Sequence, residues 1–573
     1  GDKAIGNDIT GDKAIGNDIL GNEASASKTV RSEALETGTS LPNFRQGDAI
    51  ILYERNRDTD NVTNKMVFKG NIEYLTENEI GIRLRATQQN PSVLPAESLY
   101  AIEHDTMDTT FRSMYQGLYI YLSARKERRD LLLSQRPPRF DESLDSMISR
   151  SEDDFTRIAL KAKAAQDYFL LIGPPGTGKT SCALKKMVET FHADKDAQIL
   201  LLSYTNRAVD EICKSLASIA PAVDFIRVGS ELSCDEAYRG HLIENELSSC
   251  NRRSEVYERI RNCRIIVGTV AAISGKPELF RLKHFDVAII DEATQILEPQ
   301  LLGILCARGE DGKDAIDKFV LIGDHKQLPA VVQQNTEQSA IYDESLLSIG
   351  LTNLKDSLFE RLYRNCTATV HRSYDMLCRQ GRMHPEVALF ANRAFYGGRL
   401  IPVGLPHQIE SSDTICRLAF YPSVPEKAGA SAKINYSEAR IVADLAARIY
   451  EDHQTDFDES RTLGIITPYR SQIALIKKEI ESLGIPALNR ILVDTVERFQ
   501  GSERDVIIYS FCVNYPYQLK FLSNLTEEEG VLIDRKLNVA LTRARKQMFI
   551  TGVPELLERN PLYKSLLKLI ESF

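Results

Sequence analysis

Short apolar runs alternate with polar positions from residue 41 to about residue 105. Stretches such as DAIILYE, KMVFKGNIEYL and EIGIRLRA are separated by Asn, Gly, Asp and Pro. Alternation of this kind places every second side chain on one face, which is typical of half-buried strands joined by tight turns. We therefore predict a small β-barrel accessory domain over 41–105.

A helical pattern follows the alternating one. Apolar residues Phe111, Leu118 and Leu122 recur at helical spacing with charged residues between them. The sequence RPPRF at 136–140 ends the pattern, because proline cannot continue a helix. We predict a helical stalk and linker over 106–150.

Two sets of continuous apolar runs occupy the rest of the chain. The first set is YFLLIG, QILLLSY, CRIIVGTV, FDVAIID and KFVLIGD, and the second is TLGIITPY, RILVDTV, DVIIYSFCV and KQMFITG. Such runs, alternating with helical segments, are typical of parallel strands buried on both faces. We predict one α/β domain over 151–340 and a second over 341–573. A charged helical insert at about 221–261 fits a solvated hairpin and a functional element equally well.

The first residues follow neither pattern. The decamer GDKAIGNDIT is followed at once by GDKAIGNDIL, and both are rich in Gly, Asp and Asn and poor in residues that build a core. We read residues 1–40 as a disordered or artefactual tail. Because the chain does not begin with Met, we expect that it can be part of a longer protein, with a nuclease domain or a partner before residue 1.

Composition narrows the classes of function. The chain has 573 residues, of which 43% are hydrophobic, and a formal net charge of −9. This negative balance excludes a uniformly basic nucleic-acid binder, so any phosphate-binding surface must be a local groove. No apolar run is long enough to span a bilayer, and the ten cysteines show no CxxC spacing. We expect a cytoplasmic, intracellular protein without membrane association, zinc finger or iron–sulfur cluster.

One segment carries a phosphate-binding pattern. LLIGPPGTGKTSCALKKM follows a predicted strand, opens a predicted helix, and has the G-x-x-x-x-G-K-[ST] spacing of a P-loop. Its glycines let backbone N–H groups curl around phosphate oxygens, while the lysine reaches the β- and γ-phosphates and the threonine hydroxyl binds Mg²⁺. The predicted nucleotide-binding residues of this loop are Gly173, Pro174, Pro175, Gly176, Thr177, Gly178, Lys179, Thr180 and Ser181.

Acidic and amide side chains at the ends of two later strands complete the predicted phosphate site. In HFDVAIIDEATQ, Asp291 is the expected Mg²⁺ ligand beside Thr180, and Glu292 is the expected general base. In VLIGDHKQLPAVV, Asp324 and Gln327 follow another strand, and the glutamine is placed to sense the γ-phosphate or the attacking water.

The motifs GPPGTGKTS, DEATQ, GDHKQLPAVV, SLFERL, GRMHP, VERFQGSERD and LNVALTRAR occur in the order found in superfamily 1 helicases. Over about 41–573 the chain resembles the 5′→3′ branch of that superfamily, which includes the up-frameshift RNA helicase and the eukaryotic Okazaki-fragment nuclease-helicase. The resemblance implies two RecA-like P-loop domains, with the β-barrel accessory domain carried on the stalk. It also implies ATP and Mg²⁺ as cofactors, and a monomer that binds single-stranded nucleic acid.

The resemblance also implies roles for residues of the second domain. Arg382 in GRMHP matches an arginine that reaches the γ-phosphate, and Arg543 in LNVALTRAR matches an arginine finger. Glu503 matches the acid that hydrogen-bonds the ribose, and Gln500 matches a glutamine that couples ATP to the nucleic-acid groove. Arg545 is expected to point elsewhere on the same helix, as a structural or phosphate-edge contact.

Further positions match the family's nucleic-acid contacts. The predicted nucleic-acid-binding residues are Asn206, Thr269, Pro468 and Thr495. Tyr204, Tyr469 and Arg470 either stack on bases or contact phosphates, or else they belong to the core and the solvated surface.

Two positions depart from the family pattern, and both concern the base. Where members carry a glutamine that reads the adenine edge, this chain has Phe155. Where the GRMHP motif usually has an aromatic residue before its arginine, this chain has Gly381. We therefore expect intact hydrolysis with relaxed base selectivity.

The leading functional hypothesis is an ATP-dependent helicase or translocase that moves 5′→3′ on single strands. DNA is favoured over RNA, because the stalk and the segment leading into the P-loop resemble bacterial relatives of the nuclease-helicase. Two alternatives stay open: an ATP-driven RNA or ribonucleoprotein remodeller without processive unwinding, and a nucleic-acid-binding module with silent catalysis.

Overall fold

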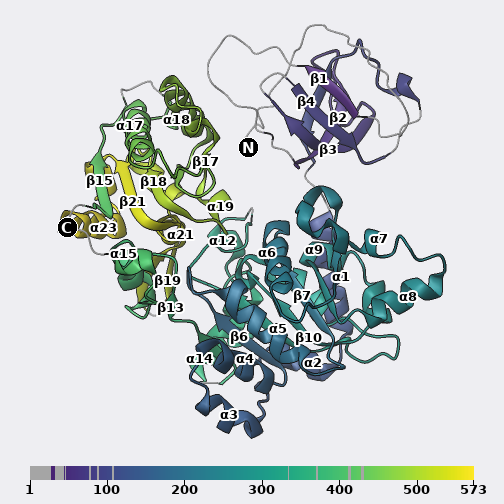
Figure 1. The fold of residues 1–573 in the computed structure, drawn as a ribbon. Coiled ribbons are helices and arrows are strands. Elements are labelled where there is room, and N and C mark those ends of the chain that lie inside the picture. Colours follow the sequence, from purple (N-terminus) through teal and green to yellow (C-terminus); the bar gives the residue numbers. More distant parts are fainter. Residues whose placement is uncertain are drawn as a thin grey trace. The chain divides into compact units, whose positions relative to one another are not determined.

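The computed structural model describes residues 27–31, 44, 47–76, 79–86, 90–105, 109–332, 334–369, 372–410, 415–426, 431–528 and 530–572 (Figure 1). The chain divides into two compact units, Gly1–Phe111 and Arg112–Phe573, and each is described by itself.

The first unit is an antiparallel sheet of five strands in the order β1-β4-β3-β2-β5. Ile50, Leu52, Ile72 and Ile82 alternate inward from three neighbouring strands and form its small core. The predicted alternation of strands is therefore present, but no pairing between the edge strands β1 and β5 closes the described residues into a barrel. The strands are β1 (Ser27–Arg31), β2 (Ala49–Glu54), β3 (Val67–Leu75), β4 (Glu79–Leu84) and β5 (Tyr100–His104).

Strand β1 lies inside the segment that the sequence predicts as a tail. Its backbone pairs with β4 from Ser27↔Arg83 to Arg31↔Glu79, so the sheet begins earlier than the predicted boundary at residue 41. The short run SKTVR has little β-strand propensity by itself, and it forms a strand because its backbone pairs with the edge of β4. The rest of the predicted tail, with both decamers, lies outside the described residues.

A parallel sheet of seven strands forms the first α/β domain of the second unit, in the order β12-β6-β11-β10-β7-β9-β8. All five apolar runs of the first predicted set are strands of this sheet, and both of its faces are buried. The strands are β6 (Tyr168–Ile172), β7 (Ile199–Ser203), β8 (Phe225–Val228), β9 (Ile265–Thr269), β10 (Phe285–Ile290), β11 (Ile316–Gly323) and β12 (Tyr374–Met376).

Helices cover both faces of this sheet (Figure 1). One face packs against α4 (Asp154–Ala164), α5 (Lys185–His192) and α6 (Asn206–Ala217). The other face packs against α2 (Lys126–Leu132), α8 (Arg253–Asn262), α9 (Val270–Ser274), α10 (Glu278–Leu282), α11 (Glu298–Leu305) and α14 (Leu358–Ala368). Four further helices are short: α3 (Asp145–Arg150), α7 (Ile243–Glu246), α12 (Thr336–Ser339) and α13 (Glu344–Ser348).

The second α/β domain is built on a parallel sheet of five strands in the order β15-β21-β18-β16-β17. Its four predicted apolar runs are all strands, and two separate apolar clusters bury its faces. The strands are β15 (Leu418–Pro422), β16 (Leu463–Ile466), β17 (Leu492–Asp494), β18 (Arg504–Ser510) and β21 (Ala544–Gly552), with the short pairs β13 (Arg379–Gln380) and β14 (Ile401–Pro402), and β19 (Leu525–Glu528) and β20 (Val531–Asp534).

This sheet also lies between two layers of helices, so the predicted fold class of two RecA-like α/β domains is confirmed. Helices α17 (Tyr436–Asp452) and α18 (Arg470–Ser482) cover one face. The other face packs against α15 (Pro385–Tyr396), α19 (Val496–Phe499), α20 (Leu519–Leu522), α21 (Arg535–Leu541), α22 (Pro554–Leu557) and α23 (Pro561–Glu571), and α16 (Pro406–Ile409) lies between β14 and β15 in sequence.

The break between the two α/β domains differs from the predicted one at 340/341. Helix α14 buries Leu358, Phe359 and Leu362 in the core of the first domain, and β12 pairs with β6 at the edge of the first sheet. The chain enters the second core only with α15. The prediction was wrong because β12 has only three residues, too few for an apolar pattern to show.

The predicted helical insert at about 221–261 is also only partly helical. Its first part is β8, a strand of the central sheet that pairs with β9. Arg227 in this strand is buried and forms an ion pair with Asp210. The charged segment that follows contains α7 and most of α8, so the element is an edge strand followed by short helices rather than a hairpin.

The predicted stalk contains α1 (Thr109–Ser123) and α2. Helix α1 approaches α11 backbone to backbone, because a Cβ at Gly303 would lie 3.1 Å from Cα of Gly117. All ten cysteines fall within the described residues and are free thiols. Among the described residues, no helix is both long and apolar enough to cross a membrane.

Candidate active site

The predicted phosphate loop follows the carboxyl end of β6 and leads into a helical turn, Lys179–Leu184, that continues as α5. Gly176 and Gly178 have φ of +73° and +76°, a left-handed conformation that favours glycine. A Cβ at Gly173 would overlap the side chain of Lys179, so glycine lets the lysine fold back across the loop. The local backbone therefore fits the cradle that a triphosphate requires.

Thr180 and Asp291 face each other at this loop. The threonine Oγ1 donates a hydrogen bond of 2.5 Å to Oδ2 of Asp291, which directly follows β10. Burial of the carboxylate, and next the charge of the adjacent Glu292, raise the pKa of Asp291 to about 6. A hydroxyl and a carboxylate are hard oxygen ligands of the kind Mg²⁺ prefers, so this pair fits the predicted ion.

Glu292 adopts a backbone conformation that is unusual for its residue type. Its φ is +53°, and holding a residue other than glycine in that region costs about 1–3 kcal/mol. The carboxylate lies 3.8 Å from Nζ of Lys179 and accepts a 2.9 Å hydrogen bond from Nε2 of Gln295. The turn after Asp291 thus aims Glu292 at the phosphate loop, where a general base is needed.

Arg543 is a buried cation for which the described residues supply no carboxylate partner. Its Nη2 donates to Oε1 of Gln327 at 2.9 Å, and its other bonds go to the carbonyl oxygens of Val539 and Ser502. Loss of water around the guanidinium, and next the charge of Arg382, lower the pKa of Arg543 to about 9. An anion bound at the neighbouring phosphate loop would stabilise this charge.

A buried hydrogen-bond network joins Gln327 to the second domain. Oδ2 of Asp324 accepts from Nε2 of Gln327 and from the hydroxyl of Tyr396, each at 2.7 Å. Nδ2 of Asn538 donates to the Tyr396 hydroxyl at 2.8 Å and to the carbonyl of Lys326 at 2.7 Å. Sequence patterns missed Tyr396 and Asn538, because a tyrosine at the end of an apolar helix and an asparagine within LNVAL both read as ordinary packing positions.

Arg382 and Glu503, predicted to contact the γ-phosphate and the ribose, contact each other. Nε of Arg382 lies 2.5 Å from Oε2 of Glu503, and a Cβ at Gly176 would overlap the Cβ of Arg382. Burial alone would raise the pKa of Glu503, but the charges of Arg382 and Arg545 bring it below its usual value. Arg382 therefore lies on the phosphate loop with its guanidinium paired to Glu503, and its contact with the γ-phosphate stays a prediction.

The two positions that depart from the family pattern both border the phosphate loop. The ring of Phe155, at the start of α4, lies 3.5 Å from where a Cβ of Gly178 would be. The N–H of Gly381 donates to the carbonyl of Gly176 at 2.9 Å, and a Cβ at 381 would meet Leu405 at 3.2 Å. Neither position offers a polar side chain that could read a base edge.

Arg545 does not lie on a helix, contrary to the sequence-based expectation. Helix α21 ends at Leu541, and Arg545 is the second residue of β21. Its Nη1 lies 3.1 Å from Oδ1 of Asp505, and its Nε lies 3.6 Å from Oε1 of Glu503. These ion pairs give it a structural position beside the site, whereas Arg543, in the turn between helix and strand, enters the site.

The four predicted nucleic-acid contacts lie at the carboxyl edges of the two sheets. Asn206 is the first residue of α6, just after β7, and Thr269 ends the neighbouring strand β9, where it pairs with Ser203 of β7. Pro468 and Thr495 follow neighbouring strands of the second sheet. Thr269 Oγ1 also caps α9 by accepting from the N–H of Ala272, so this hydroxyl has a structural role as well.

Gln500 and Tyr204 both lie in loops, one after a helix and the other after a strand. Gln500 follows α19, two residues before Ser502, whose carbonyl accepts from Arg543. Tyr204 follows β7 and is 38% exposed, which excludes the core interpretation, while its contact with a base or a phosphate stays a prediction.

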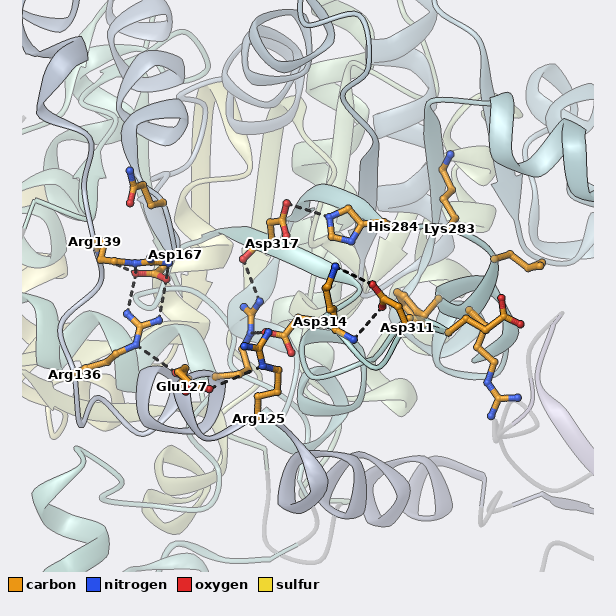
Figure 2. Close-up of a pocket in the computed structure, with 18 of the residues that line it drawn as sticks. Arg125, Glu127, Arg136, Arg139, Asp167, Lys283, His284, Asp311, Asp314 and Asp317 are labelled. Atoms are coloured by element: carbon orange, nitrogen blue, oxygen red, sulfur yellow. Dashed lines mark hydrogen bonds and ion pairs between the residues drawn. The ribbon is translucent and has the colours of Figure 1, made fainter.

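A cavity of about 1230 Å³ lies at the opposite, amino edge of the first sheet (Figure 2). Figure 2 shows Arg136 and Arg139 holding Asp167 just before β6, with bonds of 2.9 Å from each guanidinium, and His284 paired with Asp317. The two pairs with Asp167 hold the segment after α2 against the sheet, and the pair of His284 with Asp317 joins the residue before β10 to β11. Basic and acidic residues alternate around the cavity, and it belongs to the stalk attachment rather than to the phosphate site.

Comparisons with known proteins agree with this architecture. One family described as an AAA domain matches residues 150–256 and 243–335, and another of the same description matches residues 354–555. The chain is 28% identical to a DNA replication ATP-dependent helicase/nuclease of Arabidopsis thaliana, over 95% of this chain and 40% of that protein. The chain is also 27% identical to a DNA replication ATP-dependent helicase/nuclease of Bos taurus, over 93% of this chain and 50% of that protein.

A shorter relative is matched over most of its length. The DNA polymerase alpha-associated DNA helicase A of Saccharomyces cerevisiae is 24% identical over 80% of this chain and 73% of that protein. A solved arterivirus nonstructural protein 10 (helicase) aligns with 12% identity and a TM-score of 0.36, over 92% of this chain and 77% of that one. The chain spans half or less of the length of the helicase/nucleases it matches. The motif order, the two parallel sheets, the AAA-domain matches and the helicase relatives show that the chain belongs to the superfamily 1 helicases, on their 5′→3′ branch.

Proposed function

We propose that this chain is an ATP-dependent helicase that moves 5′→3′ along single-stranded DNA. The observation that carries the proposal is the buried Arg543, which comes from the second domain and donates to Gln327 of the first, and which forms no ion pair with a carboxylate among the described residues. A structural arginine in the core would have such a partner, whereas a finger awaiting the phosphates of ATP would not.

Each side chain of the site has a distinct task in this proposal. Lys179 neutralises the β- and γ-phosphate oxygens, and Thr180 with Asp291 holds Mg²⁺, which supplies further charge neutralisation when bound. Glu292 accepts the proton of the attacking water. Arg543 offsets the negative charge that develops on the transferred phosphoryl group, and this contribution commonly accounts for about 10³–10⁵ in rate.

The sheet edges connect hydrolysis to movement. Asn206 and Thr269 lie at the carboxyl edge of the first sheet, and Pro468 and Thr495 lie at the carboxyl edge of the second, so a nucleic-acid strand that contacts all four would be held by both domains. The two domains would close when ATP binds and open after hydrolysis, in a hinge motion. Each cycle would change which of the two edges binds the nucleic-acid strand more tightly. The names of the matched relatives favour DNA as the strand. A monomeric state and a cytoplasmic location stay predictions from the sequence.

A strand-displacement assay tests polarity and substrate together. Wild-type protein is expected to unwind duplex DNA bearing a 5′ tail and to leave a 3′-tailed duplex intact, with ATP turnover stimulated by the single strand. The Lys179→Ala variant, which lacks the phosphate-binding ammonium, serves as the inactive control. Unwinding from 3′ tails alone would contradict the polarity. Stimulation by RNA alone, or stimulation without displacement, would favour the remodeller instead.

Base selectivity gives a second test. Because Phe155 and Gly381 offer the base no polar contact, turnover of GTP and CTP is expected to stay within about a hundredfold of ATP turnover, or about 2.7 kcal/mol in transition-state free energy. The measurement is kcat/KM for each nucleotide with saturating single-stranded DNA. A larger preference for ATP would show that other groups read the adenine.

A further inference from the structure

An exposed aromatic cluster lies on the second domain, in the segment between β18 and β19. The rings of Tyr515 and Tyr517 stack with centroids 5.8 Å apart and 15° between their planes. Tyr517 also meets Phe521 edge to face, with centroids 6.5 Å apart. Tyr517 is 54% exposed and Phe521 is 69% exposed, so folding leaves most of both rings uncovered. Rings this exposed contribute little to the core and are available to a ligand.

The backbone beneath these rings is firmly held. Leu519 and Leu522 of α20 are buried in the core of the second domain, and Phe521, between them, is directed outward. Gln518 is buried as well, and its Oε1 accepts a 2.9 Å hydrogen bond from the N–H of Tyr515. Because the cluster is ordered before any ligand arrives, binding to it costs little conformational entropy.

The same glutamine joins the cluster to the proposed strand-binding edge. Nε2 of Gln518 donates to the hydroxyl of Tyr469 at 3.1 Å, and Tyr469 directly follows Pro468 in the loop after β16. Lys520 is exposed on α20 and offers a cation to a nearby phosphate. The aromatic cluster is therefore continuous with the edge that carries Pro468 and Thr495.

We propose that Tyr517 and Phe521 form a base-stacking platform, which extends the single-strand site across the second domain beyond Pro468. The ligand is an unpaired stretch of nucleic acid, and the inference rests on the proposed function. Every base presents a flat π-face, so stacking tolerates any sequence, as a protein that moves along a strand requires. The hydrogen bond from Gln518 to Tyr469 keeps the platform in register with the loop after β16.

Titration of oligothymidylate and of an abasic strand of equal length tests the platform at one fixed salt concentration. For the Tyr517→Ala/Phe521→Ala variant, the Kd for oligothymidylate is expected to rise by about tenfold per ring. The Kd for the abasic strand, which has no bases to stack, should match that of wild type. ATP turnover without a strand should also be unchanged, because both rings are far from full burial.

Two further variants separate stacking from other effects. Tyr517→Phe keeps the ring and should bind as wild type does, and Tyr342→Ala removes an 81% exposed ring elsewhere in the same unit and should change nothing. Equal affinities of wild type and the double variant for oligothymidylate would overturn the platform, and so would an equal loss for the abasic strand. If the wild-type protein bound no single strand at all, both the platform and the proposed helicase function would be contradicted.

Discussion

Replacing Arg543 with alanine is expected to lower kcat for ATP hydrolysis by about a thousandfold or more. The guanidinium is supplied from the second domain, between α21 and β21, and its Nη2 already lies 2.9 Å from Gln327. Its charge is desolvated, so its attraction to a developing phosphoryl charge acts in a low dielectric and is strong. Steady-state turnover with saturating single-stranded DNA measures the effect.

The neighbouring arginine provides a matched control for this variant. Arg545→Ala removes a cation only two residues away, but one engaged by Asp505 and Glu503, so kcat should change by no more than about threefold, under about 1 kcal/mol. Affinity for the single strand should be retained in both variants, because neither arginine lies at the carboxyl edges. Turnover of Arg543→Ala within about threefold of wild type would show that the arginine finger is assigned wrongly.

The residues that the sequence predicts for the phosphate site lie together in the structure, because local structure sets the position of each. Lys179 and Thr180 are fixed by one strand, one turn and one helix, and Asp291 follows directly after a second strand. Parallel strands end at the same edge of a sheet, so side chains that follow such strands must converge. The structure brings Thr180 within 2.5 Å of Asp291, across more than a hundred residues of chain, for that reason.

The features that escaped prediction depend on tertiary contacts. β12 has three residues and exists because β6 offers an unpaired edge, and that contact places the domain break after Met376 instead of at 340. The pairing of Arg382 with Glu503 could not be read from motifs that assign each of them to the nucleotide. Asn538 and Tyr396 form their bond only because α15 and α21 pack together, and neither residue carries a signal of its own.

Removal of the Asp324 carboxylate is expected to reduce kcat by at least about a hundredfold while ATP affinity falls much less. Asp324→Ala takes the acceptor from both Gln327 and Tyr396, and hydrogen bonds to a charged group commonly contribute about 1.5–3 kcal/mol each. Gln327 is then free to turn away from Arg543, so the finger loses its position in the closed site. The hydrogen bonds recorded for the Asp324 side chain among the described residues go to Lys326, Gln327 and Tyr396, so we expect its effect to be one of positioning.

The companion variant Tyr396→Phe separates the two halves of this network. It removes one hydroxyl, leaves the Asp324–Gln327 bond in place, and breaks the link from Asp324 to Asn538 of the second domain. We expect turnover without DNA to be nearly normal and stimulation by DNA to fall about tenfold, because the strand acts on hydrolysis through domain closure. A structural role alone would lower the midpoint of thermal unfolding and both turnover rates together. If Tyr396→Phe lowered turnover without DNA and turnover with DNA by the same factors as Asp324→Ala does, the network would carry no coupling between the domains.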